Sequence, residues 1–443
     1  MNKYLIKNAQ IVNENKIFHG DILIKNERIE KIASNIQDKD AIEINAEDYI
    51  CIPGAIDDQV HFREPGLTHK ATIFSESRAA VAGGITTFFE MPNTVPQATT
   101  QVLLEDKYQI AHNNSLANYS FFMGTTNDNY DEVMKTNPQT ICGIKIFMGS
   151  STGNMLVDDQ QILEKIFANA PTIIATHCED EQTIKNNLAY YTEKYGDKLD
   201  ATFHARIRNN EACFLSSSMA IQLAKKNNTR LHILHISTGE ETHLFDNQIP
   251  LKDKKITAEA CIHHLWFSDK DYSTKGNWIK WNPAVKSEAD RDEIWKALLD
   301  GRIDVIATDH APHTIEEKEQ IYLKAPSGGP LVQHSIQAIL DFHEQGKISL
   351  EQIVEKMCHN PAILFNVKDR GFIREGYFAD LVLIKKESKK VVKDNLLYKC
   401  QWSPFEGHIF NHQISKTFIN GHLAYDNGIF NESKTGKRIE FER

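Results

Sequence analysis

Short apolar runs alternate with longer segments of helical periodicity through the middle of the chain. Continuous apolar runs are typical of buried parallel strands, and the longer segments between them are predicted to be the helices that join these strands. One such connector, SESRAAVAGG at 75–84, is ended by its glycines. Eight strands with intervening helices predict an α/β fold, a (β/α)8 TIM-type barrel over residues 53–371. The eight runs are AIDDQVHF (55–62), GITTFFEMPN (84–93), ANYSFFMG (117–124), CGIKIFMG (142–149), TIIATHC (172–178), RLHILHIS (230–237), ITAEACIHHL (256–265) and DVIATDHAPH (304–313).

The two ends of the chain have a different pattern. Residues 1–52 and 372–443 contain short alternating runs, such as YLIKNAQIV, ADLVLIKK and KRIEFER (437–443), separated by Asn and Gly. This alternation is typical of antiparallel strands, and each end has too few strands to be stable alone. We therefore predict that both ends pair into one small composite β-sandwich domain beside the barrel.

Composition places the chain among ordinary globular proteins. Of 443 residues, 41% are hydrophobic and 25% are charged, which suffices for a buried core and allows two or three domains. The 50 Lys and Arg against 60 Asp and Glu give a net charge of −10, which does not favour contact with phosphate backbones. We expect no nucleic-acid partner.

The cysteines and the N-terminal residues bear on the compartment. Seven cysteines are scattered without a C-x-x-C pair, which excludes a disulfide framework or a zinc ribbon and is typical of a reducing environment. The N-terminal segment has no apolar core of signal-peptide length, and no stretch reaches the roughly 20 apolar residues of a membrane span. We expect a cytoplasmic protein with no membrane partner.

Polar residues lie near the ends of six predicted strands. In a closed parallel barrel the carboxyl ends of the strands converge on one mouth, where barrel enzymes have their active sites. Residues far apart in the sequence would therefore be neighbours there. The six are His61, Asn93, Lys145, His177, His235 and Asp309.

The chemistry of these six side chains indicates a metal centre. Three His and one Asp are suitable ligands for Zn2+, Mn2+ or a similar ion, which lowers the pKa of a bound water toward about 7. Each histidine alone is more often a hydrogen-bonded structural residue, so the prediction depends on the set. Lys145 lies inside an apolar strand, where a bare ammonium is costly to bury. We expect it to be modified, neutral or paired, or to extend its stem to the barrel mouth.

Seven segments of the chain resemble the cyclic amidohydrolases, and among them the dihydroorotases. The H-x-R-E-P-G and M-P-N-T elements are closer to dihydroorotases than to hydantoinases, which lack the arginine motif, or to allantoinases, which differ after M-P. The flanking strands also resemble the composite sandwich of that family. The segments are PGAIDDQVHFREPG (53–66), AGGITTFFEMPNTVP (82–96), GIKIFMGSSTG (143–153), ATHCED (175–180), LHILHIST (231–238), KWNPAV (280–285) and ATDHAPH (307–313).

The resemblance implies a binuclear zinc site at the barrel mouth. One metal ion would be held by an H-x-H pair on the first strand and by Asp309, and the other by His177 and His235. Lys145, N6-carboxylated to a carbamate, would bridge them. The carbamate would also remove the cost of burying Lys145, because the cation becomes an anion with two metal partners.

The chain departs from the family pattern at the first metal position. Where the family has H-x-H, this chain has Gln59 two residues before His61. An amide oxygen is a weak zinc ligand beside imidazole, so we expect the first position to bind less tightly or to stay empty. Three outcomes remain open: a two-metal site with Gln59 as a weak or outer-shell ligand, a one-metal enzyme, or an inactive homologue.

The resemblance implies the reversible hydrolysis of L-dihydroorotate to N-carbamoyl-L-aspartate in the de novo synthesis of pyrimidines (UMP). Asp309 would be the catalytic group, a general base that becomes the general acid for the leaving ring nitrogen; the alternative role is ligand only.

Four residues are expected to bind the carboxylate-bearing small-molecule substrate. Arg63 can form a bidentate pair with a carboxylate. Asn93, Asn282 and His313 would complete the contacts, and segment 311–331 would be a binding loop. The alternatives are a surface ion pair for Arg63 and turn formation for the two asparagines.

Several other polar residues are left outside the ligand set. We expect His232 to face away from the site, because it lies at an odd offset from His235. His263 and His264 are adjacent and read as core residues, and Glu259 as an outer-shell partner at most.

Two other functions compete with this interpretation. The chain could be another cyclic amidohydrolase, such as a dihydropyrimidinase (hydantoinase) or an allantoinase, or a catalytically inactive homologue that acts as a structural partner. Gln59 favours the last. The resemblance also suggests a homodimer and an association with aspartate carbamoyltransferase.

Overall fold

Parallel strands form a closed ring in the middle of the chain. The computed structural model describes residues 3–149 and 154–443, so the end of segment 143–153 lies outside the described residues. One sheet has the order β6-β7-β8 and a second the order β14-β13-β12-β11-β10-β9. The strands are β6 (Ala55–Val60), β7 (Ile85–Glu90), β8 (Asn118–Phe121), β9 (Met123–Gly124), β10 (Ile144–Phe147), β11 (Ile174–His177), β12 (Leu231–Ile233), β13 (Ile256–Cys261) and β14 (Val305–Ala307).

Two contacts join these sheets into the predicted (β/α)8 barrel. Strands β8 and β9 are the two halves of one predicted strand, separated only at Phe122. A parallel bridge from Val60 to His310 closes the ring between β6 and the segment that follows β14. The barrel prediction is confirmed, although the strands are shorter than the apolar runs. The run at 256–265, for example, ends as the helix α8 (Ile262–Trp266).

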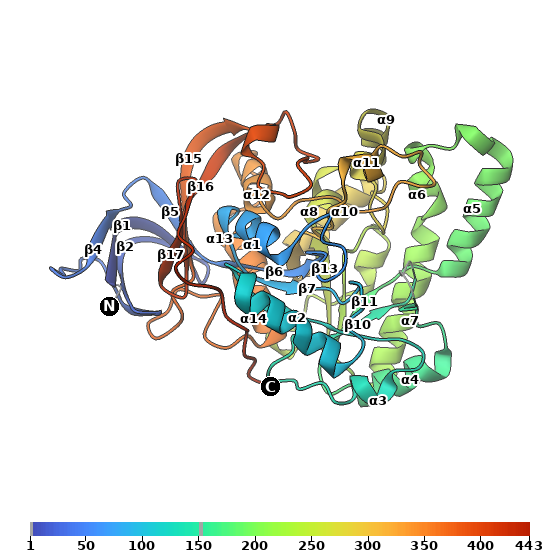
Figure 1. Ribbon diagram of the computed structural model, residues 1–443, viewed down its shortest axis with the longest axis horizontal. Coiled ribbons are helices and arrows are strands. Elements are labelled where there is room, and N and C mark those ends of the chain that lie inside the picture. The colour runs from blue at the N-terminus through green and yellow to red at the C-terminus, as the bar shows by residue number, and fades with distance from the viewer. Residues whose placement is uncertain (1–2, 150–153) are drawn as a thin grey trace.

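Helices surround the ring (Figure 1). Helix α1 begins after Thr72, whose side chain accepts from Ser75 N, and ends at Gly83. A Cβ at Gly83 would lie 2.5 Å from Val332 O, so only glycine permits this close approach. None of the helices in the described residues could cross a membrane. The others are α2 (Gln101–Asn114), α3 (Tyr130–Val133), α4 (Gln160–Asn169), α5 (Glu181–Tyr195), α6 (His204–Ile207), α7 (Asn210–Asn227), α9 (Tyr272–Lys275), α10 (Glu288–Leu299), α11 (Ile315–Lys318), α12 (Ser335–Glu344), α13 (Leu350–Val354) and α14 (Asn360–Phe365); α1 itself spans Ile73–Ala82.

The two ends of the chain share one nine-stranded sheet, visible in Figure 1 as blue strands beside red ones. Its order is β18-β17-β16-β15-β5-β1-β2-β3, with β4 paired to β1. The two ends meet where β5 pairs with β15, for example at Ile52 and Val382. The strands are β1 (Lys3–Asn13), β2 (Lys16–Lys25), β3 (Arg28–Ala33), β4 (Ile42–Asn45), β5 (Tyr49–Pro53), β15 (Leu381–Lys390), β16 (Ile409–Ile419), β17 (His422–Asp426) and β18 (Ile429–Phe430).

This sheet has a core of its own, formed by both ends of the chain. Ile22 and Ile24 from β2 pack with Leu381 from β15 and Phe418 from β16. A β-rich domain built from both termini is therefore present, and its predicted boundaries after residue 52 and before residue 372 stay a prediction.

The C-terminal segment differs from expectation. We expected residues 437–443 in the sandwich, but Arg438 forms a bridge with Tyr119 of β8, and Phe441 packs with Phe89 and Phe365. This cluster also contains Ile56 and Val305, at the beginnings of β6 and β14, so the segment closes the N-terminal end of the barrel. An alternating pattern specifies a half-buried strand but not its partner.

All seven cysteines are buried and unpaired, as the scattered spacing predicted. They lie in both the β-rich domain, at Cys51, and the barrel, at Cys142 and Cys261.

Asp380 connects the β-rich domain to the barrel. Its carboxylate forms a buried ion pair with Arg370, and its Oδ1 accepts from Asn420 N (2.7 Å). Asn118 Nδ2, from β8, lies 3.4 Å from Oδ2. Because each partner comes from a different segment, the carboxylate fixes three segments at once.

We expect Asp380→Ala to lower the free energy of unfolding by about 3–5 kcal/mol, because it leaves the Arg370 guanidinium buried without a partner. Urea unfolding followed by circular dichroism measures this. The control is Glu440→Gln, which breaks an exposed pair with Lys368 and should cost less than about 1 kcal/mol. Equal effects of the two substitutions would contradict the role of Asp380.

Candidate active site

The carboxyl ends of the barrel strands surround a cavity of about 270 Å³. Every residue that the sequence singled out for the site lines this cavity. They are Gln59, His61, Arg63, Asn93, Lys145, His177, His235, Asn282, Asp309 and His313. Barrel closure thus brings together side chains from strands β6, β10 and β11 and from the segments that follow β6, β7, β12, β13 and β14.

Three of these residues have left-handed backbone conformations. The φ angles are 70° at Arg63, 39° at His235 and 47° at Asp309. Non-glycine residues adopt such angles at a cost of about 1–3 kcal/mol, and they concentrate at functional sites. Each lies two or three residues after a strand, where the turn directs the side chain into the cavity.

One side of the cavity presents nitrogen atoms that lack hydrogen-bond partners. Lys145 is 1% exposed, and burial lowers its pKa to about 7. Within the described part of the chain, neither Lys145 Nζ nor His235 Nδ1 has a hydrogen-bond partner. His177 Nδ1 and His235 Nε2 lie 3.0 Å apart, close to the roughly 3.3 Å between two nitrogen ligands of tetrahedral zinc. Burial also lowers the pKa of both imidazoles, which favours the neutral form that binds metals. This side fits a divalent cation.

Glu179 and Arg208 hold His177 from behind. His177 Nε2 lies 2.9 Å from Glu179 Oε2, and Arg208 forms an ion pair with the same carboxylate. Burial alone would raise the pKa of Glu179, but Arg208 and His177 hold it far below its usual value. A carboxylate that accepts the outer N–H of an imidazole fixes its tautomer and leaves the other nitrogen free to bind a metal.

The opposite side of the cavity is hydrogen-bonded within itself. Gln59 Nε2 donates to Asp309 Oδ1 (3.2 Å), and His61 Nε2 lies 3.2 Å from the same oxygen. His61 Nδ1 lies 2.8 Å from Asn93 Oδ1. The Cys261 sulfur lies 3.8 Å from Gln59 Oε1, but its thiol has a closer acceptor in Glu259 Oε1 (3.1 Å). The two sides therefore differ: on this side the polar atoms have hydrogen-bond partners within the chain, whereas Lys145 Nζ and His235 Nδ1 on the other side have none among the described residues.

A buried guanidinium forms a further wall. Arg63 is 7% exposed, and burial lowers its pKa to about 10. Its Nε donates to Pro312 O (3.0 Å), and its second nitrogen lies 3.0 Å from His313 Nε2. Glu317 pairs with Lys70 and His313 (3.0 and 3.5 Å). No carboxylate in residues 3–149 or 154–443 forms an ion pair with Arg63, so this cation faces the cavity without an anion.

The predicted binding loop contributes residues 326–328 to the cavity wall. Lys318 is buried, and its Nζ donates to Pro326 O (3.0 Å) and Gly328 O (2.8 Å). Gly328 has φ 128°, and a Cβ there would lie 2.5 Å from Ala311 O. The loop is therefore fastened by an ammonium and shaped by a glycine.

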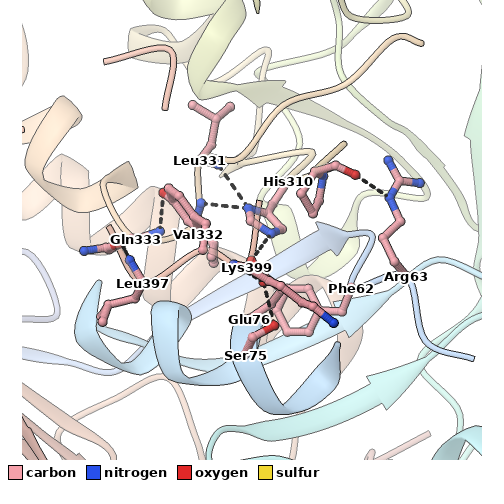
Figure 2. A network of polar contacts seen from close by, with 12 residues as sticks. Phe62, Arg63, Ser75, Glu76, His310, Leu331, Val332, Gln333, Leu397 and Lys399 are labelled. Carbon is pink, nitrogen blue, oxygen red and sulfur yellow. Dashed lines mark hydrogen bonds and ion pairs between the residues drawn. The ribbon is translucent and has the colours of Figure 1, made fainter. Parts of the chain in front are cut away.

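A polar network behind the cavity fixes His310 (Figure 2). Leu331 N and Val332 N donate to His310 Nδ1 (3.0 and 3.3 Å). Because Nδ1 accepts, the ring proton is on Nε2, which donates to Glu76 Oε2 (2.9 Å). Lys399 N donates to the other oxygen of Glu76 (3.1 Å). Helix α1, the loop after β14 and the C-terminal part of the chain thus meet at one imidazole.

This network acts directly on the cavity, because His310 follows Asp309. His310 O accepts from His61 N (2.7 Å). The fixed His310 therefore sets the direction of the chain at both Asp309 and His61.

A separate charged cluster lies outside the cavity lining. His232 Nε2 lies 3.2 Å from Asp58 Oδ2 and 3.7 Å from Glu259 Oε2, and all three residues are fully buried. Burial opposes protonation of His232, but the two carboxylates raise its pKa to about 9. These residues could also hold a metal ion, yet an imidazolium between two carboxylates accounts for them without one. Glu259 Oε1 accepts from His235 N (2.9 Å), the outer-shell contact considered from the sequence.

Sequence reasoning missed some contributors to the site. Trp281 lines the cavity and stacks on His263 (4.5 Å between ring centroids), which agrees with a core position for that histidine. Lys318, Glu76 and His310 support the cavity from outside it. The sequence gives only a weak signal for these residues. His310 could have been noticed because it follows Asp309 directly, but Glu76 looks like an ordinary helix residue.

The chain is similar along most of its length to known proteins. A model of the amidohydrolase family matches residues 50–424. A dihydroorotase from Halobacterium salinarum is 32% identical, covering 88% of this chain and 89% of that protein. A dihydroorotase from Lactococcus lactis is 33% identical, covering 95% and 99%, and an allantoinase from Bacillus velezensis is 28% identical, covering 96% and 94%. The solved L-hydantoinase (dihydropyrimidinase) from Arthrobacter aurescens has a TM-score of 0.92 at 26% identity, covering 97% and 98%.

We expect Glu76→Gln to loosen the support of His310. The amide places N–H groups against either His310 Nε2–H or Lys399 N–H, so one donor loses its acceptor, at a cost of about 1–3 kcal/mol. Hydrogen exchange followed by mass spectrometry should show faster exchange in the peptide that contains Leu331 and Val332. The control is Glu432→Gln, whose carboxylate is exposed and which should leave exchange in this peptide unchanged. If Glu76→Gln leaves the peptide with Leu331 and Val332 as protected as in the wild type, the assigned network is contradicted.

Proposed function

The chain belongs to the amidohydrolase family, whose model spans residues 50–424, and on this premise we propose that it is a dihydroorotase. It is a metal-dependent cyclic amidohydrolase that reversibly hydrolyses the ring amide of L-dihydroorotate to N-carbamoyl-L-aspartate in de novo pyrimidine (UMP) biosynthesis. Dihydroorotases at 31–33% identity over most of the chain support this activity.

The observation that best supports dihydroorotate as the substrate is the buried Arg63 guanidinium. It faces the cavity without an ion-pair partner among the described residues, and an unpaired buried cation is costly. The carboxylate of dihydroorotate supplies the missing charge, and the planar guanidinium can bind it with two hydrogen bonds. Asn93 lines the same cavity and can donate its amide to that carboxylate, and His313 lies beside it and accepts from the Arg63 guanidinium (3.0 Å).

The ring of the substrate has a partner in Asn282. Its Oδ1 is buried and has no hydrogen-bond partner within the described part of the chain, although the residue lines the cavity. An amide oxygen in this position can accept a ring N–H of dihydroorotate. Residues 326–328 then cover the ring from the side of the loop.

The unpartnered nitrogen atoms of Lys145 and His235 support metal dependence. We assign Lys145, His177 and His235 as ligands of Zn2+ on one side of the cavity, and His61 and Asp309 as the candidate ligands of a second position on the opposite side. Such an ion lowers the pKa of water toward about 7 and polarises the ring carbonyl. N6-carboxylation of Lys145 belongs to the same proposal; its support is the low pKa of the buried amine, because only the neutral amine reacts with carbon dioxide.

Asp309 moves the proton. Its carboxylate lies on the cavity wall, where it can accept a proton from the attacking water and return it to the ring nitrogen that leaves. Gln59 Nε2 and the His61 ring hold the carboxylate in position. In the reverse reaction the same group removes the proton from the carbamoyl nitrogen.

The competing functions fit less well. A hydantoinase or allantoinase activity would leave Arg63 without a carboxylate partner, although proteins of both kinds resemble this chain. An inactive structural partner would gain nothing from three strained, cavity-facing residues. We further propose a cytoplasmic location, supported by seven unpaired cysteines. A homodimer and an association with aspartate carbamoyltransferase rest on the family resemblance alone.

The direct test is turnover of L-dihydroorotate and cyclisation of N-carbamoyl-L-aspartate by the full chain. We expect Asp309→Ala to reduce kcat at least about 1,000-fold in both directions, because it removes the proton acceptor. Circular dichroism should show an unchanged fold. The control is Asp300→Ala, which is partly exposed on a turn; ordinary activity of Asp309→Ala would contradict the mechanism.

We expect Arg63→Ala to lower kcat/KM for dihydroorotate about 100-fold, because it removes charged hydrogen bonds to the carboxylate. Any hydantoin turnover should fall much less. Arg63→Lys keeps the charge and should recover only part of the loss. Equal losses for both substrates would show that Arg63 supports the fold rather than the carboxylate.

A further inference from the structure

The two sides of the cavity differ in their readiness for a metal ion. Lys145 Nζ and His235 Nδ1 have no hydrogen-bond partner among the described residues, and His177 Nδ1 bonds only to the other ring nitrogen of His235. At Gln59 and Asp309 the polar atoms already bond to each other. The inference drawn from this difference rests on the metal-dependent function proposed above.

The orientation of the Gln59 amide is fixed by Asp309. Gln59 is 1% exposed in β6, and its Nε2 donates to Asp309 Oδ1 (3.2 Å). The opposite orientation would place the amide oxygen against the carboxylate oxygen, two acceptors with no proton between them. The thiol of Cys261 does not decide the orientation, because its single proton has a closer acceptor in Glu259 Oε1 (3.1 Å) than in Gln59 Oε1 (3.8 Å).

In this orientation Gln59 presents N–H groups, the positive end of its dipole, to the first metal position. A cation held by His61 and Asp309 would face that positive end and would have to displace the hydrogen bond to Asp309. Apart from a bridging Lys145, only His61 and Asp309 would remain as protein ligands, one fewer than an H-x-H pair with Asp309 would supply. The opposite side offers three nitrogen-bearing side chains, with His177 held by Glu179.

We propose that this chain binds one divalent ion, at Lys145, His177 and His235, and that the Gln59 amide takes the place of the second ion by donating to Asp309. Gln59 is then a positioning residue. It holds the Asp309 carboxylate where a binuclear enzyme would use a cation, and it does so without adding charge to the cavity.

The test counts metal ions on the full chain. Protein purified without chelator is incubated with zinc chloride, freed of excess by gel filtration and analysed by mass spectrometry of the metal. We expect about one zinc per chain in the wild type and about two in Gln59→His, which supplies the third ligand of the first position. Gln59→Leu, which offers neither donor nor ligand, should stay at about one.

A spectroscopic measurement on the wild type tests the inference even if a variant folds poorly. With manganese as the only metal, the wild type should give the electron paramagnetic resonance spectrum of an isolated ion, and Gln59→His that of a coupled pair. A coupled pair in the wild type, or two zinc ions per chain, overturns the inference. So does zinc that persists in His177→Ala, because it would lie elsewhere, as at Asp58, His232 and Glu259.

The dihydroorotate assay on the same samples separates this inference from the proposed function. Turnover with two metal ions overturns the single-ion arrangement and supports the function. One ion without turnover in either direction supports the arrangement and contradicts the function.

Discussion

The barrel closes between its first and last strands, and the contact that closes it passes through His310. Its backbone bridges to Val60 and accepts from His61, while its ring is held by Glu76 and two loop amides. Asp309 immediately precedes this residue in a left-handed conformation. The geometry of the cavity therefore depends on how firmly one imidazole is fixed. A strained turn persists only where its surroundings over-determine it, and the Glu76–His310 network is that support.

The second constraint is charge. Lys145 and Arg63 are both buried at the cavity, and neither forms an ion pair with a carboxylate within the described residues. Their isolation is unfavourable in the free protein, so binding of a carboxylate or modification of the amine relieves a cost already present in the fold. Other charges nearby are balanced locally: His232 lies between two carboxylates, and Glu179 is paired with Arg208. The unpaired charges of Lys145 and Arg63 thus face the cavity, where a substrate or a modification can reach them.

Much of this arrangement could be predicted from the sequence because it follows from simple periodicity. Continuous apolar runs marked the barrel strands, and polar residues at their carboxyl ends marked the cavity, since closure of a parallel barrel leaves those ends only one place to meet. The pattern could not assign partners. Residues 437–443 alternate like a sandwich strand but lie across the end of the barrel. Nor could it find Glu76 or Lys318, whose roles arise from contacts between segments far apart in the chain. The orientation of the Gln59 amide is likewise a property of its contact with Asp309 and not of its position in the motif.

The buried, unpaired cysteines have a practical consequence. Each thiol is covered in the native state, so an alkylating reagent reaches it only when the surrounding segment opens. Cys51 lies in the β-rich domain, Cys142 beside the N-terminal end of the barrel and Cys261 behind Gln59. Alkylation rates at individual thiols, read by peptide mapping, would thus give separate opening equilibria for the β-rich domain, the closed end of the barrel and the cavity wall. The native chain therefore contains its own set of local stability probes.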